Sequence, residues 1–115
     1  MPIPPEINAL VQRLNQELSQ VEQEASAAVL IVRNLLNRFP SKALLTQMFA
    51  LANSTLMFVS NRRQIVQDTQ RLLEREEISA SAIQSAGEEL SQMLGQVIET
   101  KIRIIEIKSR LERMQ

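Results

Sequence analysis

An unbroken apolar stripe in the first third of the chain constrains the fold most. Apolar residues recur at alternating intervals of four and three, at Ile7, Val11, Leu14, Leu18, Val21, Ala25, Ala28, Val32, Leu35 and Phe39. This spacing keeps all of these side chains on one face of an α-helix. Pro4 and Pro5 suit a first helical turn, and Pro40 ends the stripe because proline removes a backbone donor. We therefore predict a helix over residues 5–38.

Two further segments show heptad spacing. The second segment carries a broad apolar stripe made of Leu44, Leu45, Met48, Leu51, Ala52, Thr55, Phe58, Val59, Ile65, Val66, Leu72 and Leu73. The third carries Ala86, Leu90, Met93, Val97, Thr100, Ile104, Ile107, Leu111 and Met114. A stripe as broad as the second, about two seams side by side, is typical of a helix that touches two neighbours. We predict helices over residues 42–76 and 80–114.

Serines stand where the second and third helices are expected to begin. Ser41 is the expected N-cap of the second helix, since its hydroxyl could accept a hydrogen bond from a free amide of the first turn. Ser79 is the expected N-cap of the third, with Ile78 and Ile83 at the two positions of a hydrophobic staple. A capping box that starts at Ser81 is the alternative.

The fold class follows from these helices and from the scarcity of strand formers. Aromatic residues make up 3% of the chain, and there are only two glycines. Helices of about 35 residues span roughly 50 Å, and very short connections make consecutive helices antiparallel. We predict an all-α fold in which residues 1–115 form one domain. Its three long helices would make an antiparallel, up-down-up, coiled-coil-like bundle, as a monomer or as a dimer.

The residue types that are missing weigh against catalysis. The chain has no histidine and no cysteine, so the commonest nucleophiles, general bases and zinc ligands are absent. The carboxylate pairs Glu76–Glu77 and Glu88–Glu89 consist of adjacent residues, which point about 100° apart on a helix, and we interpret both as solvated surface. We expect no enzyme activity, no small-molecule substrate, no cofactor and no metal site.

Arg62 is the strongest candidate for a buried functional group. It lies inside an apolar stripe, with Thr55 and Thr69 seven residues away on either side, and we expect all three to be buried polar residues. A structural role, in which Arg62 extends out of the seam or pairs with an acid on a neighbouring helix, is the favoured interpretation. The alternatives are a contact with a partner and an anionic-ligand or enzyme site; Lys101 is a weaker candidate for the same role.

Nucleic acid and membrane are not the expected partners. The chain has 13 basic and 13 acidic residues, and the basic residues that end the third helix alternate with Glu99, Glu106 and Glu112. No aromatic platform accompanies the basic edge of helices two and three. Gln47, Asn53 and Ser54 interrupt the most apolar stretch, and residues 1–7 do not resemble a secretory signal. We expect a soluble, cytoplasmic protein, with a nucleic-acid accessory role as an alternative.

Apolar residues outside the main seams suggest a protein partner. Phe49, Leu56 and Met57 lie on the far side of the second helix, and Ile98, Ile102 and Ile105 form a second stripe on the third. A bundle that cannot cover them exposes an apolar patch, and such patches mark protein interfaces; helix rotation that covers them is the alternative. We predict a non-catalytic interaction module (an adaptor, assembly factor or regulator) that self-associates as a homodimer or binds another protein.

Overall fold

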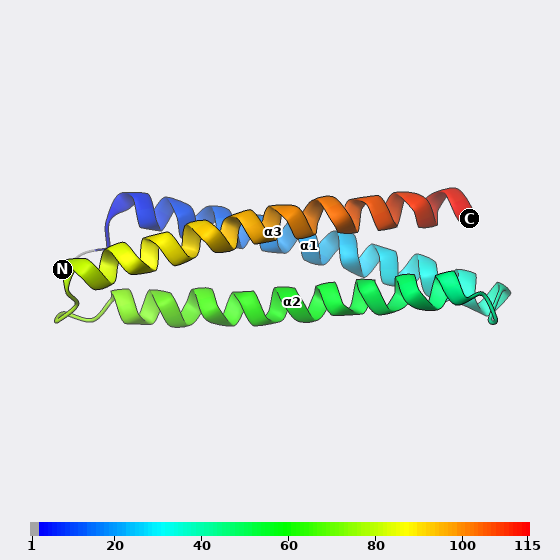
Figure 1. Ribbon diagram of the computed structural model, residues 1–115, viewed down its shortest axis with the longest axis horizontal. Helices are drawn as coiled ribbons and strands as arrows, with labels where there is room; N and C mark the ends of the chain where they lie inside the picture. The colour runs from blue at the N-terminus through cyan, green and yellow to red at the C-terminus, as the bar shows by residue number, and fades with distance from the viewer. Residues whose placement is uncertain (1–2) are drawn as a thin grey trace.

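The computed structural model describes residues 3–115 as three helices packed into a slender rod (Figure 1). Helix α1 spans Pro5–Arg38, α2 spans Ala43–Leu73 and α3 spans Ala80–Met114. The Cα atoms extend over 58 × 17 × 16 Å. Residues 3–115 contain no strand, so the prediction of an all-α fold is confirmed. Met1 and Pro2, the start of the predicted domain, lie outside the described residues.

Contacts between the helices fix how they lie beside one another. Lys101 of α3 pairs with Glu17 of α1, and Lys108 pairs with Glu24, so residue numbers rise together in these two helices. Between α2 and α3 the order is reversed. Met48 shares a hollow with Met114, whereas Leu72 shares one with Ala82. The two connections, residues 39–42 and 74–79, lie at opposite ends of the rod (Figure 1).

The second helix begins and ends differently from the prediction. Its N-cap position is Lys42, no side chain caps it, and the expected cap at Ser41 is wrong. The amide of Lys42 bonds to the carbonyl of Phe39, so Ser41 belongs to a turn that precedes the helix. At the other end α2 stops at Leu73, three residues before the predicted end. The amide of Arg75 bonds only three residues back, to Leu72, and the chain then turns.

The third helix begins as its sequence predicts. The amide of Ala82 donates a hydrogen bond of 3.1 Å to the Ser79 hydroxyl, which satisfies one amide of the first turn. Ile78 and Ile83 are both half-buried and pack against the core. The helix then runs from Ala80 to Met114, which matches the predicted range.

The core centres on α1. Nine of the ten members of its predicted stripe are buried, and the exception is Phe39, in the connection after the helix. Helix α1 packs against both other helices, whereas α2 and α3 touch each other least. The core residues of α2 are Leu45, Met48, Ala52, Val59, Val66 and Leu73. Each buried residue among residues 3–115 is apolar.

Candidate interaction surface

A second apolar seam on α2 remains open to solvent. Five large side chains follow one another at intervals of seven residues, at Leu44, Leu51, Phe58, Ile65 and Leu72, directly beside the buried seam. Leu44, Leu51, Ile65 and Leu72 are 47, 53, 36 and 40% exposed, and Phe58 is half-buried. We call these five residues the open seam. The sequence had indicated two seams on this helix, and only one of them is fully covered.

The open seam forms one wall of a groove between α2 and α3. Near its middle, Leu51 and Phe58 line a hollow together with Ile107 of α3. Leu44 lines a second hollow with Met114 near one end, and Leu72 lines a third near the other end. We call this surface the α2–α3 groove. It consists of these three separate hollows, on the side of the rod where α2 and α3 touch each other least.

Arg62 ties the two walls of this groove together. Its guanidinium donates to the Asn61 side chain and, at 3.4 Å, to Oε1 of Gln96 on α3. It also lies 4.6 Å from the centroid of the Phe58 ring, within the range of a cation–π contact. Two of the Arg62 donors and one face of its guanidinium are therefore engaged within the chain, which favours the structural interpretation of this residue.

The prediction that Thr55, Arg62 and Thr69 are buried is wrong. All three are half-buried, because they lie on the flank of α2 where α3 leaves the groove open. The Thr55 hydroxyl donates a hydrogen bond of 2.9 Å to the carbonyl of Leu51 on its own helix, which satisfies it without a neighbour. An interior polar cluster able to enclose a ligand is not formed by these three residues.

Ion pairs line both flanks of α1. On the side of α3, Lys101 Nζ lies 2.6 Å from Glu17 Oε2 and Lys108 Nζ lies 2.8 Å from Glu24 Oε2. On the side of α2, Arg63 pairs with Glu22. The hydrogen bond that Lys108 donates to Glu24 raises the pKa of Lys108 above its usual value, although partial desolvation opposes the rise. Lys101, the weaker ligand-binding candidate, is thus engaged within the bundle.

The residues predicted to form an interaction patch do not lie on one surface. Phe49 and Leu56 precede Arg63 by two heptads and one heptad, and so share the flank of α2 that faces α1; both are half-buried against the core. The Arg33 guanidinium of α1 lies 5.8 Å from the Phe49 ring centroid. Met57 is 73% exposed and points away from the buried Val59.

The three isoleucines of the predicted patch lie on another flank. Ile98 and Ile105 stand one turn before and one turn after Lys101, on the side of α3 that faces α1. Ile102 and Ile105 are exposed, and Ile98 is half-buried. The heptad pattern placed these residues outside the main seam correctly, but it could not show on which side of α1 each group would lie.

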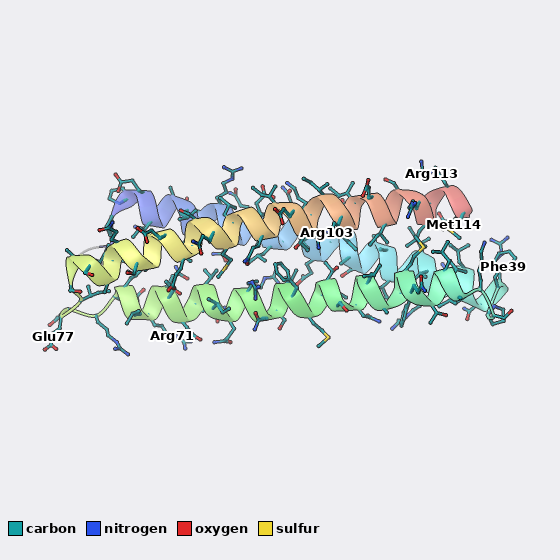
Figure 2. All side chains as sticks on the ribbon, viewed as in Figure 1. Phe39, Arg71, Glu77, Arg103, Arg113 and Met114 are labelled. Atoms are coloured by element: carbon teal, nitrogen blue, oxygen red, sulfur yellow. The ribbon has the colours of Figure 1, made fainter. Side chains whose placement is uncertain are left out.

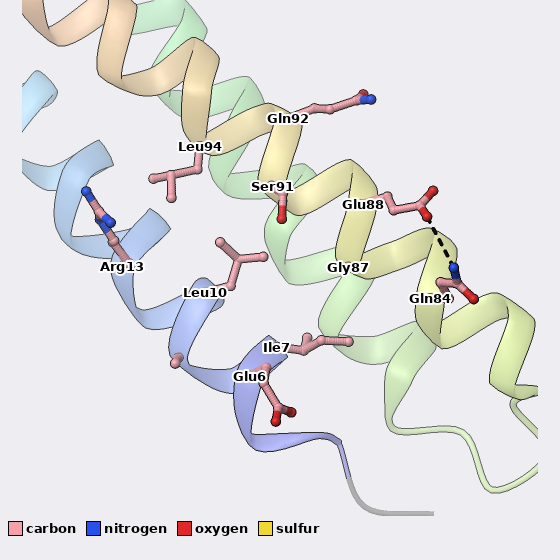
Figure 3. A pocket seen from close by; sticks show the side chains of 11 residues that line it. Glu6, Ile7, Leu10, Arg13, Gln84, Gly87, Glu88, Ser91, Gln92 and Leu94 are labelled. Carbon is pink, nitrogen blue, oxygen red and sulfur yellow. Dashed lines mark hydrogen bonds between the residues drawn. The ribbon is translucent and has the colours of Figure 1, made fainter.

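A large hollow lies between the N-terminal parts of α1 and α3 (Figure 3). It measures about 810 Å³, and Ile7 and Leu10 point from α1 toward Gly87 and Leu94 of α3. Its rim carries Glu6, Arg13 and Glu88, and Gln84 donates to Glu88 at 3.4 Å. Charges of both signs on this rim do not converge on one point, so the hollow lacks the arrangement that orients a small charged ligand.

Charge is distributed unevenly along the rod. When the helices are divided near Val21, Val59 and Val97, the half that contains the 74–79 connection has eight acidic and five basic residues. The other half has eight basic and five acidic residues. Glu77 and Arg113 mark the two ends (Figure 2). The neutral chain is thus a rod with one acidic and one basic half.

Two further properties of the described residues bear on what the surface binds. Among residues 3–115, no group of three or more acidic side chains is placed to hold a metal ion. Helix α2 is long and apolar enough to cross a membrane by length and composition, a test that core helices of soluble proteins also pass. Only 22% of its most apolar stretch is buried, however, so much of the apolar surface of α2 is uncovered.

Comparison with known proteins does not assign the chain to a group. No family model, no curated protein and no solved structure matches it. The function must therefore be inferred from the surface itself.

Proposed function

We propose that this chain is a non-catalytic protein–protein interaction module, an adaptor, assembly factor or regulator that acts in the cytoplasm through apolar helix faces and self-associates. Its scaffold is an antiparallel, up-down-up, coiled-coil-like bundle, an arrangement supported by the order of the contacts that Lys101 and Lys108 make with α1 and by the reversed order along the α2–α3 groove.

The observation that carries this proposal is the open seam of α2. Burying one fully exposed large apolar side chain contributes about 1.5–3 kcal/mol. The seam has five such side chains in one line, and because four of them are 36–53% exposed and Phe58 is half-buried, each contributes a fraction of this. Exposure of these side chains does not stabilise the monomer, whereas a helix that docks along the seam would bury all five of them. Contiguous apolar surface of this kind marks interfaces in soluble proteins.

The competing functions receive less support from the same residues. An anionic-ligand or enzyme site would need several cations that converge on one cavity, but Arg62 is bonded to Asn61 and Gln96, and Lys101 is paired with Glu17. A nucleic-acid accessory role would need a basic face, yet Glu99 lies within 4.0 Å of Arg103 on the basic half of the rod. Apolar recognition is the interaction that the exposed side chains favour.

The experiment that tests this proposal compares binding before and after the exposed apolar residues become polar. The full chain is used as bait in an extract of its native source and is studied alone by light scattering. We expect retention of a second copy or of another protein, and loss of that retention when Leu51, Met57 and Ile65 are all replaced by glutamate while the helical circular dichroism persists. A monomeric chain whose retained proteins do not change with these substitutions would contradict the proposal.

A further inference from the structure

We propose that the occupant of the α2–α3 groove is a second copy of this chain, docked antiparallel so that α2 of each copy lies along the groove of the other. This inference rests on the proposed function and makes it specific, because it names the partner, the surface and the orientation. Three properties of the groove support it.

The first property is the symmetry of the open seam. Phe58 is its central member and also the middle residue of α2, with two seam residues on either side. A twofold axis through Phe58 therefore pairs Leu51 with Ile65 of the second copy, Leu44 with its Leu72, and Phe58 with itself. Interfaces of this isologous kind, in which one surface meets itself, are the commonest among homo-oligomers.

The second property is charge complementarity. In the antiparallel arrangement the basic half of each copy lies against the acidic half of the other. Arg110 and Arg113 border the groove near its basic end, and Glu77, with Arg75 beside it, borders the groove near the acidic end. A parallel arrangement would instead place like charges side by side, which is unfavourable. The charge pattern thus selects both the partner and its direction.

The third property is the area that the rod leaves exposed. The accessible surface is 7353 Å², whereas folded monomers of 13.1 kDa expose about 6,400 Å². The elongated shape produces this excess of about 1,000 Å². An interface of standard size removes about 800 Å² from each partner. Side-by-side pairing of two rods would thus return the exposed area of each to the ordinary range.

The first arm of the test measures mass in solution. Sedimentation equilibrium of the full chain from about 1 to 100 μM covers the range of modest affinities, and we expect twice the chain mass. The double variant Leu51→Glu/Ile65→Glu should raise the dissociation constant by about 100-fold or more, since each substitution occurs twice in a symmetric interface. Met57→Glu is the matched control, on the same helix but outside the groove, and should remain dimeric.

The second arm measures orientation. The chain has no cysteine, so a single introduced cysteine is the only thiol that can react with the cross-linker. Gln47→Cys and Asp68→Cys lie about 30 Å apart along one helix at 1.5 Å per residue. A thiol cross-linker much shorter than this should join the two variants to each other in an equimolar mixture and should join neither variant to itself. Self-linking of each variant alone would show parallel pairing and would overturn the antiparallel inference.

The remaining outcomes separate this inference from the proposed function. A wild-type chain that stays monomeric overturns the dimer, and so does a dimer that Met57→Glu breaks while Leu51→Glu/Ile65→Glu does not. In either case the bait experiment still decides whether the chain binds another protein. Binding of the monomer to anionic phospholipid vesicles, lost in the Leu51→Glu/Ile65→Glu variant, would assign the open seam to a membrane surface and likewise overturn the dimer. Circular dichroism of each variant establishes that the helices persist.

Discussion

The two sides of α3 differ in how they are closed. Toward α1, Glu17 and Glu24 pair with Lys101 and Lys108 along the seam, and Ile7 packs beside Gly87. Toward α2, the described cross-connection between side chains is the Arg62–Gln96 hydrogen bond, and apolar side chains line open hollows. Both sides carry heptad apolar residues. The difference teaches that apolar spacing alone does not close a seam, since the covered side of α3 has flanking ion pairs in addition to apolar spacing.

The largest effect expected from this comparison is a difference in stability between two leucine substitutions, one in the buried core and one in the open seam. Leu18 of α1 is fully buried, whereas Leu51 of the open seam is 53% exposed. Leu18→Ala should lower the free energy of unfolding by about 2–5 kcal/mol because it removes packed methyl groups and leaves a cavity. Leu51→Ala should change the monomer by no more than about 0.5 kcal/mol.

Urea denaturation at a concentration low enough to keep the chain monomeric measures both leucine variants. Equal losses of stability in Leu18→Ala and Leu51→Ala would show that the open seam is part of the monomer core, and the contrast between the two sides of α3 would then disappear.

An intermediate effect is expected from the ion pair at the α1–α3 boundary. The side chains of Glu17 and Lys101 are only 14 and 24% exposed. Glu17→Ala should therefore cost about 1–2 kcal/mol, since it leaves a half-buried ammonium without its acid; full burial would cost more. The control is Glu99→Ala, whose pair with Arg103 is 72–75% exposed and contributes about 0–1 kcal/mol.

A double-mutant cycle that combines Glu17→Ala with Lys101→Met isolates the coupling energy of the pair. Additive effects of the two substitutions would contradict the role assigned to this ion pair in closing the α1–α3 side.

The smallest effect is a dependence of stability on alkaline pH. The pKa of Lys108 is raised by its hydrogen bond to Glu24. A lysine whose pKa is higher in the folded state contributes stability that is fully present below its ordinary pKa of 10.5 and is lost as the pH rises through the folded value. We expect thermal stability to fall in this window in the wild type and to fall less in Lys108→Arg, whose charge persists. Identical profiles would contradict the contribution of Lys108.

The helices could be predicted from the sequence because their signals are local. The apolar stripe of residues 7–35, proline at both ends of α1 and the Ser79 cap each act within a few residues, and the structure contains all of them. The end of α2 was placed three residues too late. Residues 74–77 are good helix formers, so their local preference predicts a longer helix. The three-residue hydrogen bond from the Arg75 amide to the Leu72 carbonyl depends on the turn that follows.

The candidate surface could be predicted only in part. The sequence showed that α2 carries two apolar seams. Both have the same heptad spacing, so the spacing does not tell which of the two is buried. Which seam is covered is a matter of contacts between distant residues, such as Lys108 with Glu24, which are 84 residues apart. For the same reason Phe49 and Ile102 were expected on one patch and lie on different flanks of the bundle.

The central claim is that assembly covers the open seam and leaves Met57, about 100° away around α2, free. The most direct measurement is the rate of thiol alkylation in the single-cysteine variants Leu51→Cys and Met57→Cys as a function of protein concentration. We predict that the cysteine at position 51 becomes protected as the concentration rises, whereas the cysteine at position 57 reacts at a constant rate. Constant reactivity at position 51, or protection at position 57 alone, would contradict the claim.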